Sequence, residues 1–178
     1  MNYIFSQISV FIAVFLIGLS LMSKNKKYIL MYSIISSIFF SLQYFFLTAW
    51  EGMIINAIGI LRAMCFFIYN RKEKDIPIYV MTSLIIIYFI VMILTYEGIV
   101  SIAPFIAASL FTYSIWAKQV IVYKFLAIPI SMSWIIYNIY VGSPVGYVCD
   151  SILLVIEIGA LIEYLLRHHK KEIKKEGK

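Results

Sequence analysis

The sequence predicts an all-α membrane protein with seven spanning helices, and three observations lead to this fold class. Hydrophobic residues fill 63% of the 178 positions, charged residues fill only 13%, and the mean hydropathy is +0.94. A soluble domain holds roughly 45–50% apolar and about 25% charged residues, so this chain has too little polar surface to cover itself in water. The apolar residues come in stretches of about 20, the length of a membrane-spanning helix. These stretches do not alternate with polar residues, which favours helices over a β-barrel.

Short polar links separate the expected spans. Lysines follow the first span instead of preceding it, and it has no small-residue cleavage site, so we expect this span to be retained and not removed as a signal peptide. The spans are expected at residues 3–22, 28–47, 52–70, 77–95, 99–117, 121–141 and 145–166.

The basic residues indicate an orientation. In a seven-span layout, 14 of the 15 Lys and Arg residues fall on one side, and the links of the other side carry only Glu51 and Glu97. Since cytoplasmic loops collect Lys and Arg, the N-terminus is expected outside and the C-terminus in the cytoplasm of a bacterial-type inner membrane. The net charge of +6 is then a sign of topology and not of nucleic-acid binding. The basic tail, 168–178, is expected to lie at anionic headgroups, either specifically or as a solvated anchor.

No residue pattern indicates a metal site or a cofactor. Cys65 and Cys149 lie alone in apolar runs, and His168 and His169 are adjacent in the tail, without the spacing of metal ligands. The spans contain no His, so we expect neither catalytic residues nor an enzyme.

The chain contains an internal repeat. Moving the sequence by 94 residues matches the first three spans to the last three without a gap and pairs Ser20 with Ser114, Lys24 with Lys118, and Gly52 with Gly146. It also pairs Phe40 with Trp134 and Asn56 with Asp150. A chance match between two oily stretches is the alternative. The repeat predicts a first three-helix unit at 1–72, a linker helix at 73–97, a second unit at 98–167 and the tail at 168–178, a parallel arrangement known from transporters.

Two stretches carry a resemblance to known families: "QISVFIAVFLIGLS" at 7–20 and "SWIIYNIYVGSPVGYVCDSILL" at 133–154. The three-plus-one-plus-three plan resembles the SWEET sugar uniporters and the PQ-loop (MtN3-like) superfamily. The chain resembles more closely the YgjV-type bacterial inner-membrane proteins, over nearly its whole length up to Arg167.

The SWEET-like resemblance implies a central pocket between the two units. In that family an aromatic residue on the second helix of each unit faces an Asn on the third, which here corresponds to Phe40 with Asn56 and Trp134 with Asp150. Trp134 and Tyr137 resemble the family's W-x-x-Y element. The chain departs from the family because it has no Pro-Gln pair in the first or fifth span, and because its two candidate hinges, Pro104 and Pro129, both lie in the second unit.

Charged residues inside spans are costly unless they are paired or face a wet cavity. Arg62 and Glu157 lie at matching depths, which predicts an ion pair that either gates or couples transport or simply fixes the two units together. Asp150 and Glu157 are seven residues apart on one helix face and could relay protons. For Asn56 an interhelical hydrogen bond is an equal alternative to ligand binding. Since Tyr137 and Asn138 are adjacent, we expect Tyr137 in the pocket and Asn138 in helix packing.

These observations predict a transporter, either a uniporter or proton-coupled, of a small polar solute such as a sugar. It would work by alternating access between the two three-helix units. The alternative is a non-transporting membrane sensor or assembly partner, in which the buried polar residues would be sealed by pairing with one another. The expected partners are the solute and the lipid bilayer, with a homo-oligomer left open.

Overall fold

The computed structural model describes residues 1–23, 26–117 and 119–176, and within them it is all-helical, without strands. Lys24, Lys118 and Lys178, which belong to the predicted basic side, lie outside the described residues. The elements are α1 (Asn2–Met22), α2 (Lys26–Phe46), α3 (Trp50–Arg71), α4 (Ile78–Leu94), the short 3-10 helix η1 (Ile99–Ser101), α5 (Ile102–Trp116), α6 (Val120–Tyr140) and α7 (Pro144–Glu176).

Six helical segments of the described chain are long and apolar enough to cross a membrane, and one of them, Ile99–Trp116, consists of η1 and α5 together. The remaining helix is α4, where the sequence predicts a span at 77–95. It has 17 residues and rises about 25 Å, somewhat less than the roughly 30 Å hydrocarbon core. Pro77 precedes its first residue and favours an extended backbone there. At the other end Gly98 takes a φ of 151°, a conformation that suits glycine and keeps α4 separate from η1.

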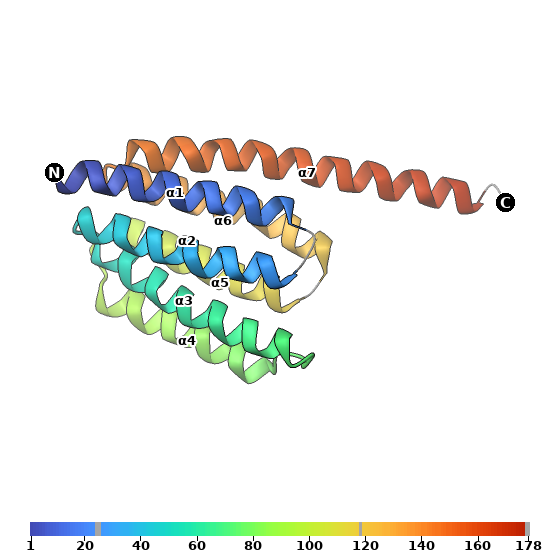
Figure 1. Cartoon of the computed structure of the whole chain (residues 1–178), viewed down its shortest axis with the longest axis horizontal. Helices are drawn as coiled ribbons and strands as arrows, with labels where there is room; N and C mark the ends of the chain where they lie inside the picture. Colours follow the sequence, from blue (N-terminus) through green and yellow to red (C-terminus); the bar gives the residue numbers. More distant parts are fainter. Residues whose placement is uncertain (24–25, 118, 177–178) are drawn as a thin grey trace.

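The helices run alternately up and down, so the two termini lie at opposite ends of the bundle (Figure 1). We call the end with Met1 the N-terminal end. The start of α2, which holds Lys27, and the link between α3 and α4, which holds Lys72 and Lys74, lie at the other end, the basic end. α7 has 33 residues and extends beyond the bundle at the basic end. The tail expected at 168–178 therefore continues this helix as far as Glu176.

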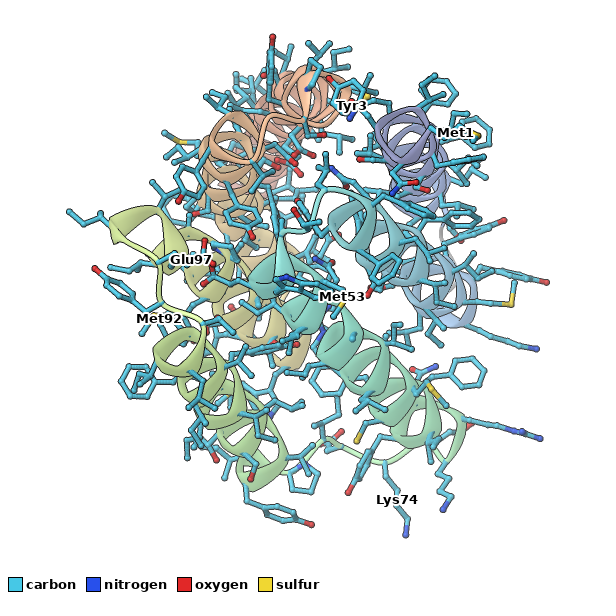
Figure 2. All side chains as sticks on the ribbon, turned by 90° about the vertical axis from the view of Figure 1, so that its left-hand side faces the viewer. Met1, Tyr3, Met53, Lys74, Met92 and Glu97 are labelled. Carbon is cyan, nitrogen blue, oxygen red and sulfur yellow. The ribbon has the colours of Figure 1, made fainter. Side chains whose placement is uncertain are left out.

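Six helices close a ring. We call α1, α2 and α3 the first triplet and α5, α6 and α7 the second triplet. Within each triplet the helices pack in chain order: α1 on α2 and α2 on α3, then α5 on α6 and α6 on α7. The triplets meet at two seams, one between α1 and α7 and the other between α3 and α5. α4 packs on the second seam, as Figure 2 shows in a view from the N-terminal end, with Met1 and Tyr3 on one side and Met92 near Glu97 on the other.

The bundle is apolar outside and unusually polar inside. Large apolar side chains such as Phe11, Leu61 and Val155 are exposed, whereas many buried side chains are polar. This distribution suits a lipid environment, where polar groups gain by facing one another. The buried apolar side chains form small clusters, of which two matter for the site: one of Tyr44, Ala103 and Tyr137, and one of Ile55, Tyr88 and Ala108.

Candidate functional site

A buried polar network joins α2, α6 and α7 near the N-terminal end. At its centre is Asn138, which is fully buried. Its Oδ1 accepts hydrogen bonds from Gln43 Nε2 (3.1 Å) and Tyr44 OH (3.2 Å), and its Nδ2 donates to Asp150 Oδ2 (2.7 Å). Gln43 Nε2 also donates to Ser143 Oγ at 2.9 Å. We call these five residues the polar network; together they connect the two triplets across the ring.

Two glycines let neighbouring helices approach this network. A Cβ at Gly146 would lie 2.8 Å from Asn138 Cγ, and a Cβ at Gly52 would lie 2.9 Å from Tyr44 Cγ and 2.7 Å from Tyr137 Cε1. Real Cβ atoms essentially never make contacts this short. The backbone N–H of Gly52 donates to Tyr137 OH at 2.9 Å, which joins α3 of one triplet to α6 of the other.

The contact between α2 and α6 is made by residues that the repeat relates to each other. The offset of 94 residues pairs Tyr44 with Asn138 and Gln43 with Tyr137. Tyr44 and Asn138 are hydrogen-bonded to each other. The contact of Gln43 with Asn138 has its counterpart in the contact of Tyr137 with Tyr44, whose ring centroids are 5.4 Å apart. These contacts are therefore reciprocal under the predicted offset of 94 residues.

Three of the predicted pocket residues come together in one aromatic cluster next to the network. Trp134 stacks on Tyr44 with 5.8 Å between ring centroids and meets Tyr137 edge-on at 6.1 Å. Phe40 packs on the cluster of Tyr44 and Tyr137. Trp134 also packs on the cluster of Ile55, Tyr88 and Ala108, so it lies between two levels of the bundle.

The two predicted polar partners of these aromatics are placed differently. Asn56 is buried and donates through Nδ2 to the carbonyl of Gly52, four residues earlier on its own helix, at 2.8 Å. Asp150 is held by Asn138, the residue that the sequence assigned to helix packing alone. Gln43 and Ser143 were not foreseen. The signal that could have found Gln43 is the repeat, because it aligns the polar pair Gln43-Tyr44 with Tyr137-Asn138.

The predicted ion pair between Arg62 and Glu157 is not formed. Arg62 Nη1 lies 3.5 Å from Tyr88 OH on α4 and 3.4 Å from Thr112 Oγ1 on α5. Glu157 Oε2 accepts a 2.7 Å hydrogen bond from Ser131 Oγ on α6. Equal depth was not enough, because α3 and α7 are not neighbours in the ring and each side chain bonds to helices beside its own.

Asp150 and Glu157 both turn toward α6, as expected from their spacing. One bonds to Asn138 and the other to Ser131, and seven residues of helix separate the two carboxyl groups by about 10 Å along the axis. A proton passing between them therefore has to cross a gap of this length.

The two predicted hinge prolines occupy different positions. Pro104 is the third residue of α5, in the first turn, where a proline is compatible with a regular helix. Pro129 lies inside α6, where it removes a backbone hydrogen bond to the carbonyl four residues before it. Of the two, only Pro129 therefore interrupts the backbone hydrogen bonds of a helix interior.

The residues around the polar network pack against one another. A shallow apolar groove of about 360 Å³ lies elsewhere, on the outside of the seam between α1 and α7. It is lined by Tyr3, Ile4, Gln7, Ile8, Phe11 and Val145. In the residues that the structure describes, no three His, Cys, Asp or Glu side chains are grouped as a metal site would require. Four hydrogen bonds join the residues of the network to one another, and only Gln43 Oε1 in it is buried without a partner among the described residues.

Six long apolar helices around a polar interior define a multi-pass helical membrane protein. The model of a family of bacterial inner membrane proteins, Imp-YgjV, matches residues 4–168. The chain belongs to this family and is a multi-pass protein of the bacterial inner membrane. No curated protein and no solved structure matches the chain.

Proposed function

We propose that this protein transports a small polar solute by alternating access between two three-helix repeats, with α4 as a short linking span. The observation that carries the proposal is the hydrogen bond between Tyr44 and Asn138, equivalent residues of the two repeats that meet in the bundle interior. Transporters built from parallel repeats place the solute near the midplane between the repeats and open by rocking one against the other.

The strength of the polar network suits a gate. A hydrogen bond within a protein stabilises by about 0.5–1.5 kcal/mol net, so the four bonds of the network amount to about 2–6 kcal/mol. Two conformations that differ by a few kcal/mol are both populated, and a bound solute can shift the balance. A closed N-terminal end is one of the two states that alternating access requires.

The aromatic cluster supplies the proposed solute site. Phe40, Trp134 and Tyr137 offer ring faces on which a sugar or another polyol can stack, and Asn56 and Asp150 offer hydrogen-bonding groups one helix away. A relationship to SWEET and PQ-loop transporters is part of this proposal. In it Pro129 acts as the hinge of α6, and Glu157 acts in coupling. Arg62 remains a proposed coupling residue as well, because it contacts Tyr88 on α4 and Thr112 on α5.

The proposed orientation has the N-terminal end outside and the basic end in the cytoplasm. Lys27 at the start of α2, and Lys72 and Lys74 in the link between α3 and α4, lie at one end and support it. A cysteine at Glu97 should then react with an impermeant thiol reagent on intact cells, and a cysteine at Lys74 only after lysis. The reverse pattern would overturn the orientation.

A sensor or assembly partner that moves no solute is the second candidate. One observation favours it: the side chains of the polar network are hydrogen-bonded mainly to one another, as in a purely structural cluster. Such a protein would keep this end closed permanently.

A counterflow assay in proteoliposomes, with a panel of sugars, polyols and small organic acids, tests transport directly. Asp150→Asn should keep the fold, since an amide can still accept from Asn138, and should abolish any pH dependence of uptake. Ser151→Ala is the matched control, because that hydroxyl bonds only to the carbonyl of Tyr147 on its own helix. Absence of flux for every solute would favour the second candidate, and unchanged pH dependence in Asp150→Asn would exclude Asp150 from proton coupling.

A further inference from the structure

Arg62 is a buried cation with no anionic partner among the described residues. Its side chain is only 4% exposed. The guanidinium carbon lies 4.5 Å from the ring centroid of Phe111, and Nη1 is 3.4–3.5 Å from the hydroxyls of Thr112 and Tyr88. Hydrogen bonds from N–H to oxygen are ordinarily 2.7–3.2 Å, so both are weak. Nε is buried and has no hydrogen-bond partner at all.

This environment does not balance the charge. Arginine is always protonated and carries five donors in a planar fork. A charge at this depth in a membrane is costly unless it is paired. The carboxyl groups of Asp150 and Glu157 lie on α7, which is not a neighbour of α3, and are engaged elsewhere, Asp150 with Asn138 and Glu157 with Ser131. Neutral hydroxyls and a ring face are therefore the partners that the described chain itself supplies.

Several hydroxyls surround the guanidinium. A Cβ built on Gly59 would lie 3.7 Å from Arg62 Nη2 and 3.6 Å from Ser37 Oγ, so both groups border the same position, which glycine leaves without a side chain. Thr112 Oγ1 already donates its proton to the carbonyl of Ala108 at 2.7 Å, so toward Arg62 this hydroxyl can only accept a hydrogen bond. Tyr88 and Ser37 have hydroxyl protons that an incoming oxygen could receive.

From this arrangement we infer that Arg62 binds the carboxylate of the transported solute, with Tyr88 and Ser37 as additional donors. This rests on the proposed function and narrows the solute to a small organic anion. The planar fork of arginine matches a carboxylate with two parallel bonds. Arg62 is the one cation among the buried side chains that the structure describes, so it balances a single negative charge and not the roughly two charges of a phosphate.

Access to the site is through α4. This helix packs mainly on α3 and α5, and in it Met81 and Tyr88 alone are buried. Tyr88 contacts Arg62 and belongs to the cluster on which Trp134 packs. The site therefore lies beside the aromatic residues of the proposed solute site. Movement of α4 between the repeats exposes or covers the guanidinium.

Binding to the purified full-length protein tests the inference without depending on flux. The probes are lactate and 1,2-propanediol, which differ in the carboxylate but are similar in size, with acetate, succinate and inorganic phosphate alongside. We expect isothermal titration to show binding of lactate, little binding of propanediol and weaker binding of phosphate. Arg62→Lys, which keeps the charge but loses the fork, should weaken lactate binding about tenfold or more. Tyr88→Phe and Ser37→Ala should each weaken it about threefold to tenfold.

The matched control is Arg71→Gln, which removes an exposed arginine at the end of the same helix and should leave binding unchanged. Equal binding of propanediol, unchanged binding in Arg62→Lys, or no binding of any carboxylate would overturn the inference. In the last case counterflow of a neutral sugar would leave the transport proposal intact. Binding of lactate through Arg62 without flux of any solute would uphold the anion site and refute transport.

Discussion

At the scale of single residues, Asn138 shows why the interior of this bundle could be predicted only in part. A lone side-chain amide in an apolar interior is costly, and here its oxygen accepts two hydrogen bonds and its nitrogen donates one. The sequence predicts Tyr137 in a pocket and the adjacent Asn138 in helix packing. Both side chains are buried, because α6 has inward neighbours on two sides: Tyr137 meets α2 and α3, and Asn138 meets α2 and α7.

Replacing Asn138 alone should be more harmful than replacing it together with its partner. Asn138→Leu leaves the carboxyl of Asp150 and the amide of Gln43 buried without this partner, so we expect the free energy of unfolding to fall by about 2–4 kcal/mol. The double variant Asn138→Leu with Asp150→Leu removes both polar groups and should recover much of this loss. Thermal denaturation in detergent measures the difference. A double variant less stable than the single one would show that Asp150 has another essential partner.

The two glycines of the repeat predict a matched pair of steric effects. Gly52→Ala and Gly146→Ala place a methyl group within 3 Å of packed atoms, so each should lower the free energy of unfolding by about 1–3 kcal/mol. Gly159→Ala is the control, since no atom lies within 4 Å of its Cβ position, and alanine there should be neutral or slightly stabilising. If denaturation midpoints of all three variants agree, the close helix approach is wrong.

At the scale of the helices, the sequence was most informative about length and least informative about orientation around the axis. Apolar stretches fixed the positions of six long helices to within a few residues, because membrane thickness sets their length. Spanning helices are apolar on most faces, so their sequence does not show which face meets which neighbour. This is why Arg62 could be placed at the depth of Glu157 and yet bond to α4 and α5 instead.

Pro129 makes α6 the helix in which a hinge can be tested. Pro129→Ala restores a possible backbone hydrogen bond to the carbonyl of Phe125, so the fold should be at least as stable as before. If α6 bends during transport, the flux should fall about threefold or more. Pro104→Ala, in the first turn of α5, is the control and should change neither. Equal flux in Pro129→Ala and the unmodified protein, measured by counterflow, would show that Pro129 is not a hinge.

At the scale of the whole molecule, the ring of six helices relates the two triplets to each other. A half-turn that exchanges α1 with α5, α2 with α6 and α3 with α7 also exchanges the seam of α1 and α7 with the seam of α5 and α3. Both seams are present. That the two triplets are equivalent stays a prediction of the sequence repeat, and the repeat could not predict the ring, because contacts between triplets depend on side chains from separate halves. α4 packs on one seam only, and this breaks the symmetry.

This arrangement predicts that joining the triplets at the N-terminal end stops transport. Leu47 and Val141 directly follow α2 and α6, are equivalent in the repeat, and both pack on the cluster of Tyr44, Ala103 and Tyr137. In a background with the half-buried Cys65 and Cys149 replaced by serine, cysteines at 47 and 141 joined by a cleavable crosslinker should lose nearly all flux and regain it on reduction.

The matched control joins two helices of the same triplet. Ser20 Oγ lies 3.4 Å from the carbonyl oxygen of Ile29, so cysteines at these positions link α1 to α2 within the first repeat. If each triplet moves as one body, this link should leave flux unchanged, because rocking alters distances between triplets and not within them. Loss of flux in both linked pairs would mean that the triplets do not move as rigid units. Full flux with 47 and 141 linked would mean that the polar network is a permanent seal, as in a sensor or an assembly partner.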